Sequence, residues 1–247
     1  MREDTPAHEI ERRRPLKERL DLIATILTAV AAVSVLVVVV VIPYFSSREP
    51  TRLENTIPPP AEHQAISGAP AIGAPSAQVA IIEYTDFQCP YCGTFAQKFL
   101  PSFRRKYVDT GRVRFVFRSL PLVDIHPQAA TAAVAAACAH RQDRFWEAYN
   151  ELFSSPLRSD ADVTTRTESV VGDVTAFRAC TSAGSLDVGA DTDRARQLGI
   201  FGTPTFLVGV IDHDAKVEVR QVLRGTVSDV ILGDAVDGLL KTAPTSR

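Results

Sequence analysis

The chain has little excess of charge of either sign. Its 247 residues include 27 Lys and Arg against 29 Asp and Glu, which gives a formal net charge of -2. Proteins that hold nucleic acid through a basic surface carry a clear positive excess. The balance of charges therefore predicts no nucleic-acid partner, and 45% hydrophobic with 23% charged residues is ordinary for a globular protein.

Cysteine is also scarce, since the chain has only four. Cys89 and Cys92 form one Cys-x-x-Cys unit, and a second unit is absent, so a four-cysteine zinc site would have to gather distant ligands. Cys138 and His140 could supply two of them, so a zinc site is an alternative to redox chemistry. The even number of cysteines fits an extracytoplasmic compartment that permits disulfides. We predict no metal and no cofactor.

One long stretch lacks charge altogether. Residues 22–42 are interrupted only by two threonines and one serine, and this length can cross a bilayer. A buried core helix is disfavoured because the stretch offers no polar face. Five basic residues lie between positions 12 and 19, whereas only two follow in the next 20 residues. By the positive-inside rule, the N-terminus is expected in the cytoplasm and the rest outside.

The N-terminal region therefore predicts a single-pass membrane protein. A cleaved signal peptide is the main alternative, but the apolar core is long for one and residues 43–47 offer no small-x-small cleavage site. We expect a cytoplasmic tail at 1–20, an uncleaved transmembrane signal anchor at 21–43, and a Pro/Ala/Gly-rich linker at 44–77. Part of the linker, near residues 65–72, is a candidate edge strand.

The remaining sequence alternates strand and helix patterns, which is typical of an α/β fold. Short apolar runs predict strands, and apolar residues at helical spacing predict helices, with two or more further helices before residue 198. The expected strands are 79–84, 113–118, 205–210 and 216–223, and the expected helices are 95–107, 128–140, 144–153 and 228–241.

The motif Cys89-Pro90-Tyr91-Cys92 carries the chemistry. Proline at the first helical position fits where no backbone N–H partner is needed, so Cys89 can occupy the helix N-cap. Free N–H groups and the helix dipole then favour its thiolate, and two thiols at this spacing can open and close one disulfide. The motif alone is ambiguous, because half a zinc site looks the same.

A second motif is Gly202-Thr203-Pro204-Thr205, which directly precedes an expected strand. A cis peptide bond before Pro204 would turn the backbone so that Thr203 offers its N–H and C=O to an extended peptide. A trans bond in an ordinary loop is the commoner arrangement, since only about 5% of X-Pro bonds are cis.

These two motifs, in order, make residues 79–241 resemble the DsbA-type thioredoxin-fold disulfide oxidoreductases. The matching segments are 83–92, 113–122, 125–127 and 201–206. The resemblance implies a thioredoxin fold at 78–245 with an inserted helical subdomain at about 124–198, and a cis peptide bond before Pro204. It implies that Cys89 is the exposed nucleophile and Cys92 the resolving thiol.

The same resemblance assigns further residues. Glu83 falls where the family has a buried acid that moves a proton to or from Cys92, although a solvated strand-end glutamate is the alternative. Thr203 falls where the family tunes reduction potential and substrate release. Cys138 and Cys180 fall where many relatives have a structural disulfide, which would stabilise the fold by about 4 kcal/mol by closing a loop of about 43 residues. Two buried free thiols are the alternative.

The sequence therefore predicts an extracytoplasmic enzyme that donates the Cys89–Cys92 disulfide to reduced secreted proteins. The resemblance implies a quinone-linked membrane thiol oxidase, similar to DsbB or VKOR, as its reoxidant. Tyr91 stands where the most oxidising relatives have histidine, so we expect a moderate oxidant. A reductase or isomerase and a non-catalytic binding module are the alternatives. We expect His126 to cap or pack rather than line the groove. We expect Trp146, with Phe145 and Tyr149, to lie in the core of the helical insert.

Overall fold

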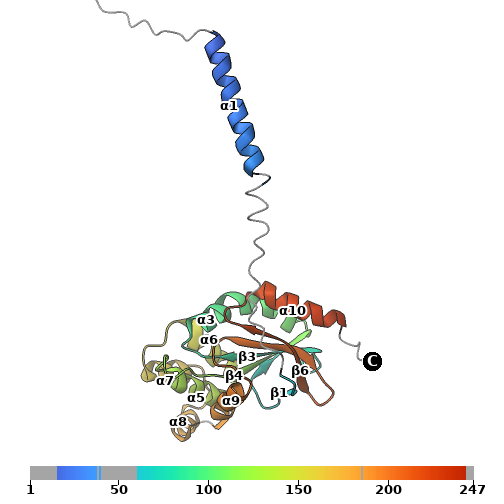
Figure 1. Ribbon diagram of the computed structural model, residues 1–247. Helices are drawn as coiled ribbons and strands as arrows, with labels where there is room; N and C mark the ends of the chain where they lie inside the picture. Colours follow the sequence, from blue (N-terminus) through green and yellow to red (C-terminus); the bar gives the residue numbers. More distant parts are fainter. Residues whose placement is uncertain (1–15, 38, 40–59, 185, 243–247) are drawn as a thin grey trace, which may run out of the picture. The chain divides into compact units, whose positions relative to one another are not determined.

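The computed structural model describes residues 16–37, 39, 60–184 and 186–242, and the chain divides into two units at residue 54. The first unit contains the helix α1 (Leu16–Leu36) (Figure 1). Among the described residues, no helix meets the combined length and apolarity needed to cross a membrane. Residues 38 and 40–43 of the expected anchor lie outside the described residues, as do 1–15 of the expected tail and 44–59 of the expected linker.

The second unit is built on a six-stranded mixed sheet with the order β1-β6-β5-β3-β4-β2. The central strands β3 and β4 are parallel, and all other neighbours are antiparallel. The four strands expected from the sequence are confirmed to within one residue at each end. The strands are β1 (Gln64–Ala65), β2 (Ala71–Ile72), β3 (Val79–Thr85), β4 (Val113–Ser119), β5 (Thr205–Ile211) and β6 (Lys216–Arg224).

Both short strands lie inside the segment that the sequence assigns to the linker. β1 pairs with β6 at one edge of the sheet, and β2 pairs with β4 at the other. Ile66 between them is buried, with 5% of its surface exposed. The folded unit therefore begins before residue 78, and the candidate edge strand is two strands, which cover backbone groups at both sheet edges.

Helices cover both faces of the sheet (Figure 1). The first face packs against a long helix that starts at α3 and runs through two wider turns to Val108, and against α10, α5 and α6. The second face packs against α9. These helices are α3 (Pro90–Thr94), α4 (Leu100–Phe103), α5 (Ala129–His140), α6 (Phe145–Ser154), α9 (Leu186–Gln197) and α10 (Asp229–Thr242).

The helices between β4 and β5 form the insert that the sequence predicts. They comprise α5, α6, α7 (Asp160–Glu168), α8 (Val174–Ala183) and α9. Tyr149 on α6 is fully buried, and its ring contacts Phe87 and Phe117 on the sheet side. The aromatic core expected within the insert is thus confirmed, and it continues onto the sheet.

Alternation along β3 decides where its acidic residue points. Successive strand residues face opposite sides, and Val79 and Ile81 lie in the same apolar cluster as Cys92. Ala80 and Ile82 lie in the cluster on the other face. Glu83 therefore points into the cluster that contains Cys92, beneath the start of α3.

Candidate redox site

The first cysteine of the motif occupies the N-cap of α3. β3 ends at Thr85, a three-residue turn follows, and Cys89 has extended backbone angles (φ -69°, ψ 122°) before Pro90 begins the helix. The Gly93 N–H donates to the Cys89 carbonyl over 3.0 Å, which closes the first helical turn. Proline fits at this position because its missing N–H would have no partner there.

The surroundings of Cys89 stabilise its thiolate. Its pKa falls to about 5, mainly because the Cys92 thiol donates a hydrogen bond to it, while partial burial opposes the shift. Thr203 and the first backbone N–H groups of α3 lower it further. Since the thiolate is the nucleophile in disulfide exchange, Cys89 is the activated thiol of the pair.

Cys92 is the opposite case. It is fully buried, and burial raises its pKa well above the ordinary range, with the Cys89 thiolate adding to the effect. Cys89 is itself less exposed than the sequence predicts, at 5%. The reason is the loop of Thr203, whose carbonyl lies 3.5 Å from the Cys89 sulfur.

Thr203 and Pro204 lie directly against the cysteine pair. The peptide bond between them is cis, and Pro204 is buried at the start of β5. The Pro204 carbonyl accepts from the Gly225 N–H over 2.8 Å. This arrangement places the Thr203 backbone beside the Cys89 sulfur.

Glu83 is a buried acid rather than a solvated one. It is fully buried, and loss of solvation raises its pKa to about 8, partly offset by the hydroxyls of Thr85 and Tyr149. None of these carboxyl or hydroxyl oxygens makes a hydrogen bond of normal geometry to another protein group. The acid therefore holds a proton at neutral pH, next to Cys92.

Tyr149 is a site residue that the sequence does not reveal. The Tyr149 hydroxyl lies beside Glu83. Burial raises the pKa of Tyr149 well above the ordinary range, and the charges of Glu83 and Cys92 raise it further. It therefore stays protonated. In the sequence it is one of several aromatic residues at helical spacing, and nothing there distinguishes a hydroxyl that faces the acid from one that faces solvent.

The other two cysteines are joined. Cys138 on α5 and Cys180 on α8 form a disulfide, whereas Cys89 and Cys92 are free thiols. This bond leaves no thiolate of Cys138 for the zinc alternative. Within the part of the chain that the structure describes, no group of three or more His, Cys, Asp or Glu side chains is arranged to hold a metal.

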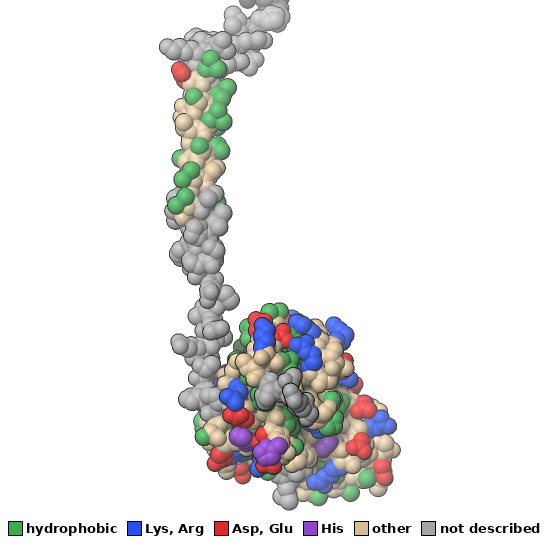
Figure 2. All heavy atoms as spheres, turned by 90° about the vertical axis from the view of Figure 1, so that its right-hand side faces the viewer, with side chains coloured by type: hydrophobic (Ala, Val, Ile, Leu, Met, Phe, Trp, Pro, Cys, Tyr) green, Lys and Arg blue, Asp and Glu red, His purple; other side chains and the backbone are tan. Residues whose placement is uncertain are grey.

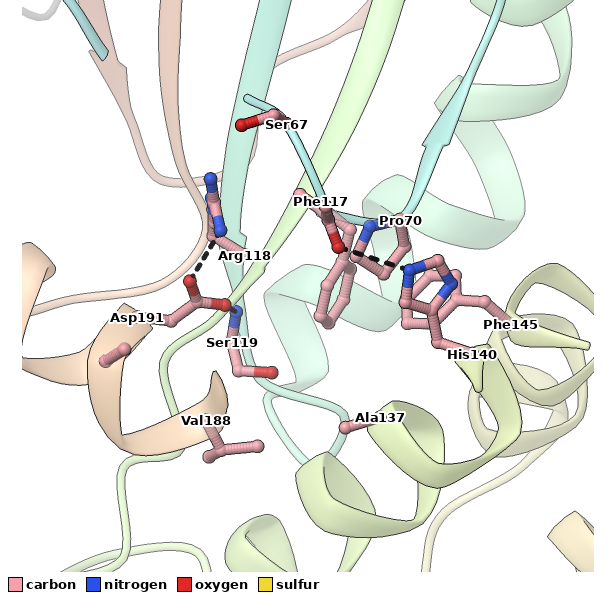
Figure 3. Close-up of a pocket in the computed structure, with 13 residues that line it drawn as sticks. Ser67, Pro70, Phe117, Arg118, Ser119, Ala137, His140, Phe145, Val188 and Asp191 are labelled. Carbon is pink, nitrogen blue, oxygen red and sulfur yellow. Dashed lines mark hydrogen bonds and ion pairs between the residues drawn. The ribbon is translucent and has the colours of Figure 1, made fainter. Parts of the chain in front are cut away.

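A cavity lies away from these residues, between the loop 67–70, β4 and the helices α5 and α9 (Figure 3). The polar groups that line the cavity contact one another or the backbone around it. Asp191 contacts Arg118 over 2.9 Å and accepts from the Ser119 N–H over 2.9 Å, while His140 lies 3.3 Å from the Gly68 carbonyl. These contacts hold the loop and the insert against the sheet, and none of the predicted site residues lines the cavity.

Comparison with known proteins gives partial matches among curated sequences. The Na(+)/H(+) antiporter NhaA 3 of Salinispora tropica is 36% identical over 160 residues, or 63% of this chain and 24% of the antiporter. This chain thus spans about a quarter of the first curated relatives it matches. The probable disulfide bond formation protein D of Bacillus anthracis is 28% identical, over 58% of this chain and 71% of that protein.

Solved structures share the fold, and a family model matches the domain. Wolbachia pipientis alpha-DsbA1 has a TM-score of 0.63 at 23% identity, over 73% of this chain and 94% of that one. A thioredoxin-like oxidoreductase from Silicibacter pomeroyi has a TM-score of 0.55 at 28% identity, over 70% and 92%. The thioredoxin family model matches residues 66–224. The chain therefore belongs to the thioredoxin family and has the fold of its DsbA-type members.

Proposed function

We propose that this protein is a thiol:disulfide oxidoreductase that donates the Cys89–Cys92 disulfide to cysteines of secreted or envelope proteins. The observation that carries the proposal is the opposed character of the two thiols, because the pKa of Cys89 is lowered to about 5 while that of Cys92 is raised. The oxidoreductase from Silicibacter pomeroyi and the disulfide bond formation protein from Bacillus anthracis support the same activity.

The reaction moves two electrons from the substrate to the cysteine pair. A substrate thiolate attacks the Cys89 sulfur, the bond to Cys92 breaks, and Cys92 leaves as a thiolate. A second substrate thiol then loses its proton and attacks the sulfur bound to Cys89. The Cys89 thiolate leaves, the substrate holds the new disulfide, and the enzyme holds two reduced cysteines.

Glu83 supplies a proton in this sequence. Cys92 is a poor thiolate because of its burial, so its departure is easier when a neighbouring acid protonates it. Glu83 is protonated below its pKa of about 8 and lies within electrostatic reach of Cys92. The same carboxylate takes the proton back when the disulfide forms again.

The stabilised Cys89 thiolate favours the reduced enzyme, which makes the disulfide oxidising. Tyr91 is 63% exposed and stands where a histidine would offer the thiolate a further donor. We therefore expect a moderate oxidant. A reduction potential below about -270 mV, the value of thioredoxin, would contradict this direction of electron flow.

The surface around Cys89 has exposed apolar side chains that could bind an unfolded protein. Tyr91 lies two residues after Cys89, and Phe201 lies two residues before Thr203. Val123 and Ile125 lie on the segment that contacts the turn before Cys89. These four side chains, here called the apolar rim, are 57–73% exposed. Exposed apolar side chains gathered at a site mark a binding surface, and a reduced, extended chain offers both the apolar contacts and the thiols.

We further propose that residues 21–43 anchor the chain in the cell membrane, with the catalytic domain outside the cytoplasm. The support is the uncharged stretch, the basic residues before it, and the exposed apolar side chains along α1 (Figure 2), of which Leu27, Val30 and Val33 are 57–63% exposed. A quinone-linked thiol oxidase in the same membrane would reoxidise the pair. If the full chain is released from membranes by alkaline carbonate, the anchor is wrong.

Replacing Cys92 by Ala tests the activity. Cys89 then cannot be released by its partner, so mixed disulfides with reduced client proteins should accumulate and disappear on adding dithiothreitol. The variant Cys92→Ala/Cys89→Ser is the control and should trap nothing. A binding module with inert cysteines would give no trapped species. Thiol trapping in cells separates the alternatives, since a reductase or isomerase keeps Cys89 and Cys92 reduced.

A further inference from the structure

The turn before the nucleophile is tied to the start of the helical insert by a buried carboxylate. The Asp86 side chain is fully buried. Its Oδ1 accepts from the Gln88 N–H over 2.7 Å, and its Oδ2 accepts from the Leu122 N–H over 2.8 Å. His126 Nδ1 also lies 2.8 Å from Oδ2. A carboxylate oxygen can only accept, so this contact is a hydrogen bond in the tautomer of His126 that carries a proton on Nδ1.

A second pair of contacts joins the same two segments. The Gln88 side-chain nitrogen donates to Gln128 Oε1 over 2.5 Å, and the Gln128 backbone N–H donates to Gln88 Oε1 over 2.7 Å. Gln128 is the residue before α5. One carboxyl–imidazole contact and one amide pair therefore connect residues 86–88 with residues 122–128.

We propose that Asp86, Gln88, His126 and Gln128 form a positioning clamp that holds Cys89 at the N-cap of α3 and holds part of the apolar rim at a fixed place beside it. The inference rests on the proposed function, since it concerns the same thiol. The turn ends with the Cys89 N–H donating to the Asp86 carbonyl over 3.1 Å. Whatever fixes Asp86 thus also fixes the sulfur against the N–H groups of the helix.

The clamp acts on the thiolate through geometry. Hydrogen bonds from N–H groups to a thiolate weaken steeply when distance or angle changes, so a loosened turn lowers the stability of the Cys89 thiolate. The clamp also holds residues 122–128, which expose Val123 and Ile125. A peptide bound to Val123 and Ile125 would therefore contact the segment whose hydrogen bonds position Cys89.

Variants of the histidine test the clamp in the full chain. His126→Ala removes the donor to Asp86, and we expect the equilibrium with glutathione to shift about fivefold toward the oxidised protein. The pKa of Cys89, followed by thiolate absorbance, should rise in parallel. His126→Asn places an amide nitrogen near the position of Nδ1 and should restore most of both values. Gln128→Ala removes one neutral hydrogen bond and should shift the equilibrium about twofold.

His213→Ala is the matched control, because the His213 side chain is 91% exposed and far along the chain from the cysteines. It should leave both values unchanged. A purely structural role predicts lower thermal stability in His126→Ala with an unchanged equilibrium and pKa, and that result overturns the proposal. If His126→Ala does not fold, an unchanged equilibrium in Gln128→Ala overturns it. If the unaltered chain exchanges no disulfide, the proposed function fails, while the Cys89 titration still decides the clamp.

Discussion

The chain holds two cysteine pairs that differ in redox state and in their place in the fold. Cys89 and Cys92 are free thiols at the start of one helix, and their environments drive their pKa values in opposite directions. Cys138 and Cys180 join two helices of the insert as a disulfide, and Cys138 is 1% exposed. The position of a cysteine in the fold therefore determines its role. Cys89 at a helix start is a reactive thiol, whereas Cys138 and Cys180 within two helices form a cross-link.

Removal of the reactive sulfur should have the largest effect on the rate of disulfide exchange. Cys89→Ser should lower the rate of disulfide exchange with a reduced peptide by roughly a thousandfold or more, because the attacked sulfur is lost. Stopped-flow fluorescence or alkylation kinetics would measure it. The double variant Cys138→Ala/Cys180→Ala is the matched control, and a comparable loss of rate there would contradict the separation of roles.

The same double variant should show its effect in stability instead. Closing a loop of about 43 residues contributes roughly 4 kcal/mol in the chain-entropy model, so the free energy of unfolding should fall by about this amount. Denaturant unfolding at fixed pH would measure the difference. A loss below about 1 kcal/mol would show that this disulfide is not the structural one.

The buried acid Glu83, which lies next to the reactive pair only, should make the free energy of unfolding depend on pH. Between pH 4.5 and about 8, the folded protein keeps the Glu83 proton that the unfolded chain has lost, so stability falls as pH rises through this window. The cost at pH 7 is about 3 kcal/mol. Glu83→Gln should flatten this slope and slow the release of Cys92. An unchanged slope would mean that the carboxyl titrates normally.

The smallest expected effect belongs to Tyr149→Phe. The hydroxyl makes no hydrogen bond of normal geometry, so its loss should change the free energy of unfolding by less than about 1 kcal/mol. Because the hydroxyl lowers the pKa of Glu83, the pH profile of exchange should move to higher pH. A profile that keeps its midpoint would leave Tyr149 with a packing role alone.

Local patterns in the sequence predict most of the fold. The apolar runs of β3 and β5 and the aromatic spacing of α6 each predict the element that forms, because burial of one face determines them. The strands β1 and β2 are less visible. They are two residues long, and their pairing depends on the edges of a sheet assembled from distant segments.

The same limit applies to the site. Cys89, Cys92 and Pro204 belong to motifs that can be recognised along the chain, and Glu83 follows from its distance to Cys89 together with the resemblance. Asp86 and His126 are 40 residues apart, and only the folded turn brings their side chains to 2.8 Å. A long-range contact of this kind leaves no local pattern.

The most direct test compares how readily the two disulfides are reduced in the same sample. The oxidised full chain is mixed with one equivalent of dithiothreitol, quenched with an alkylating reagent, and mapped by peptide mass. We expect Cys89 and Cys92 to be alkylated while Cys138 and Cys180 stay joined, because the stabilised Cys89 thiolate favours the reduced form of its pair. Preferential alkylation of Cys138 and Cys180, or equal alkylation of both pairs, would contradict it.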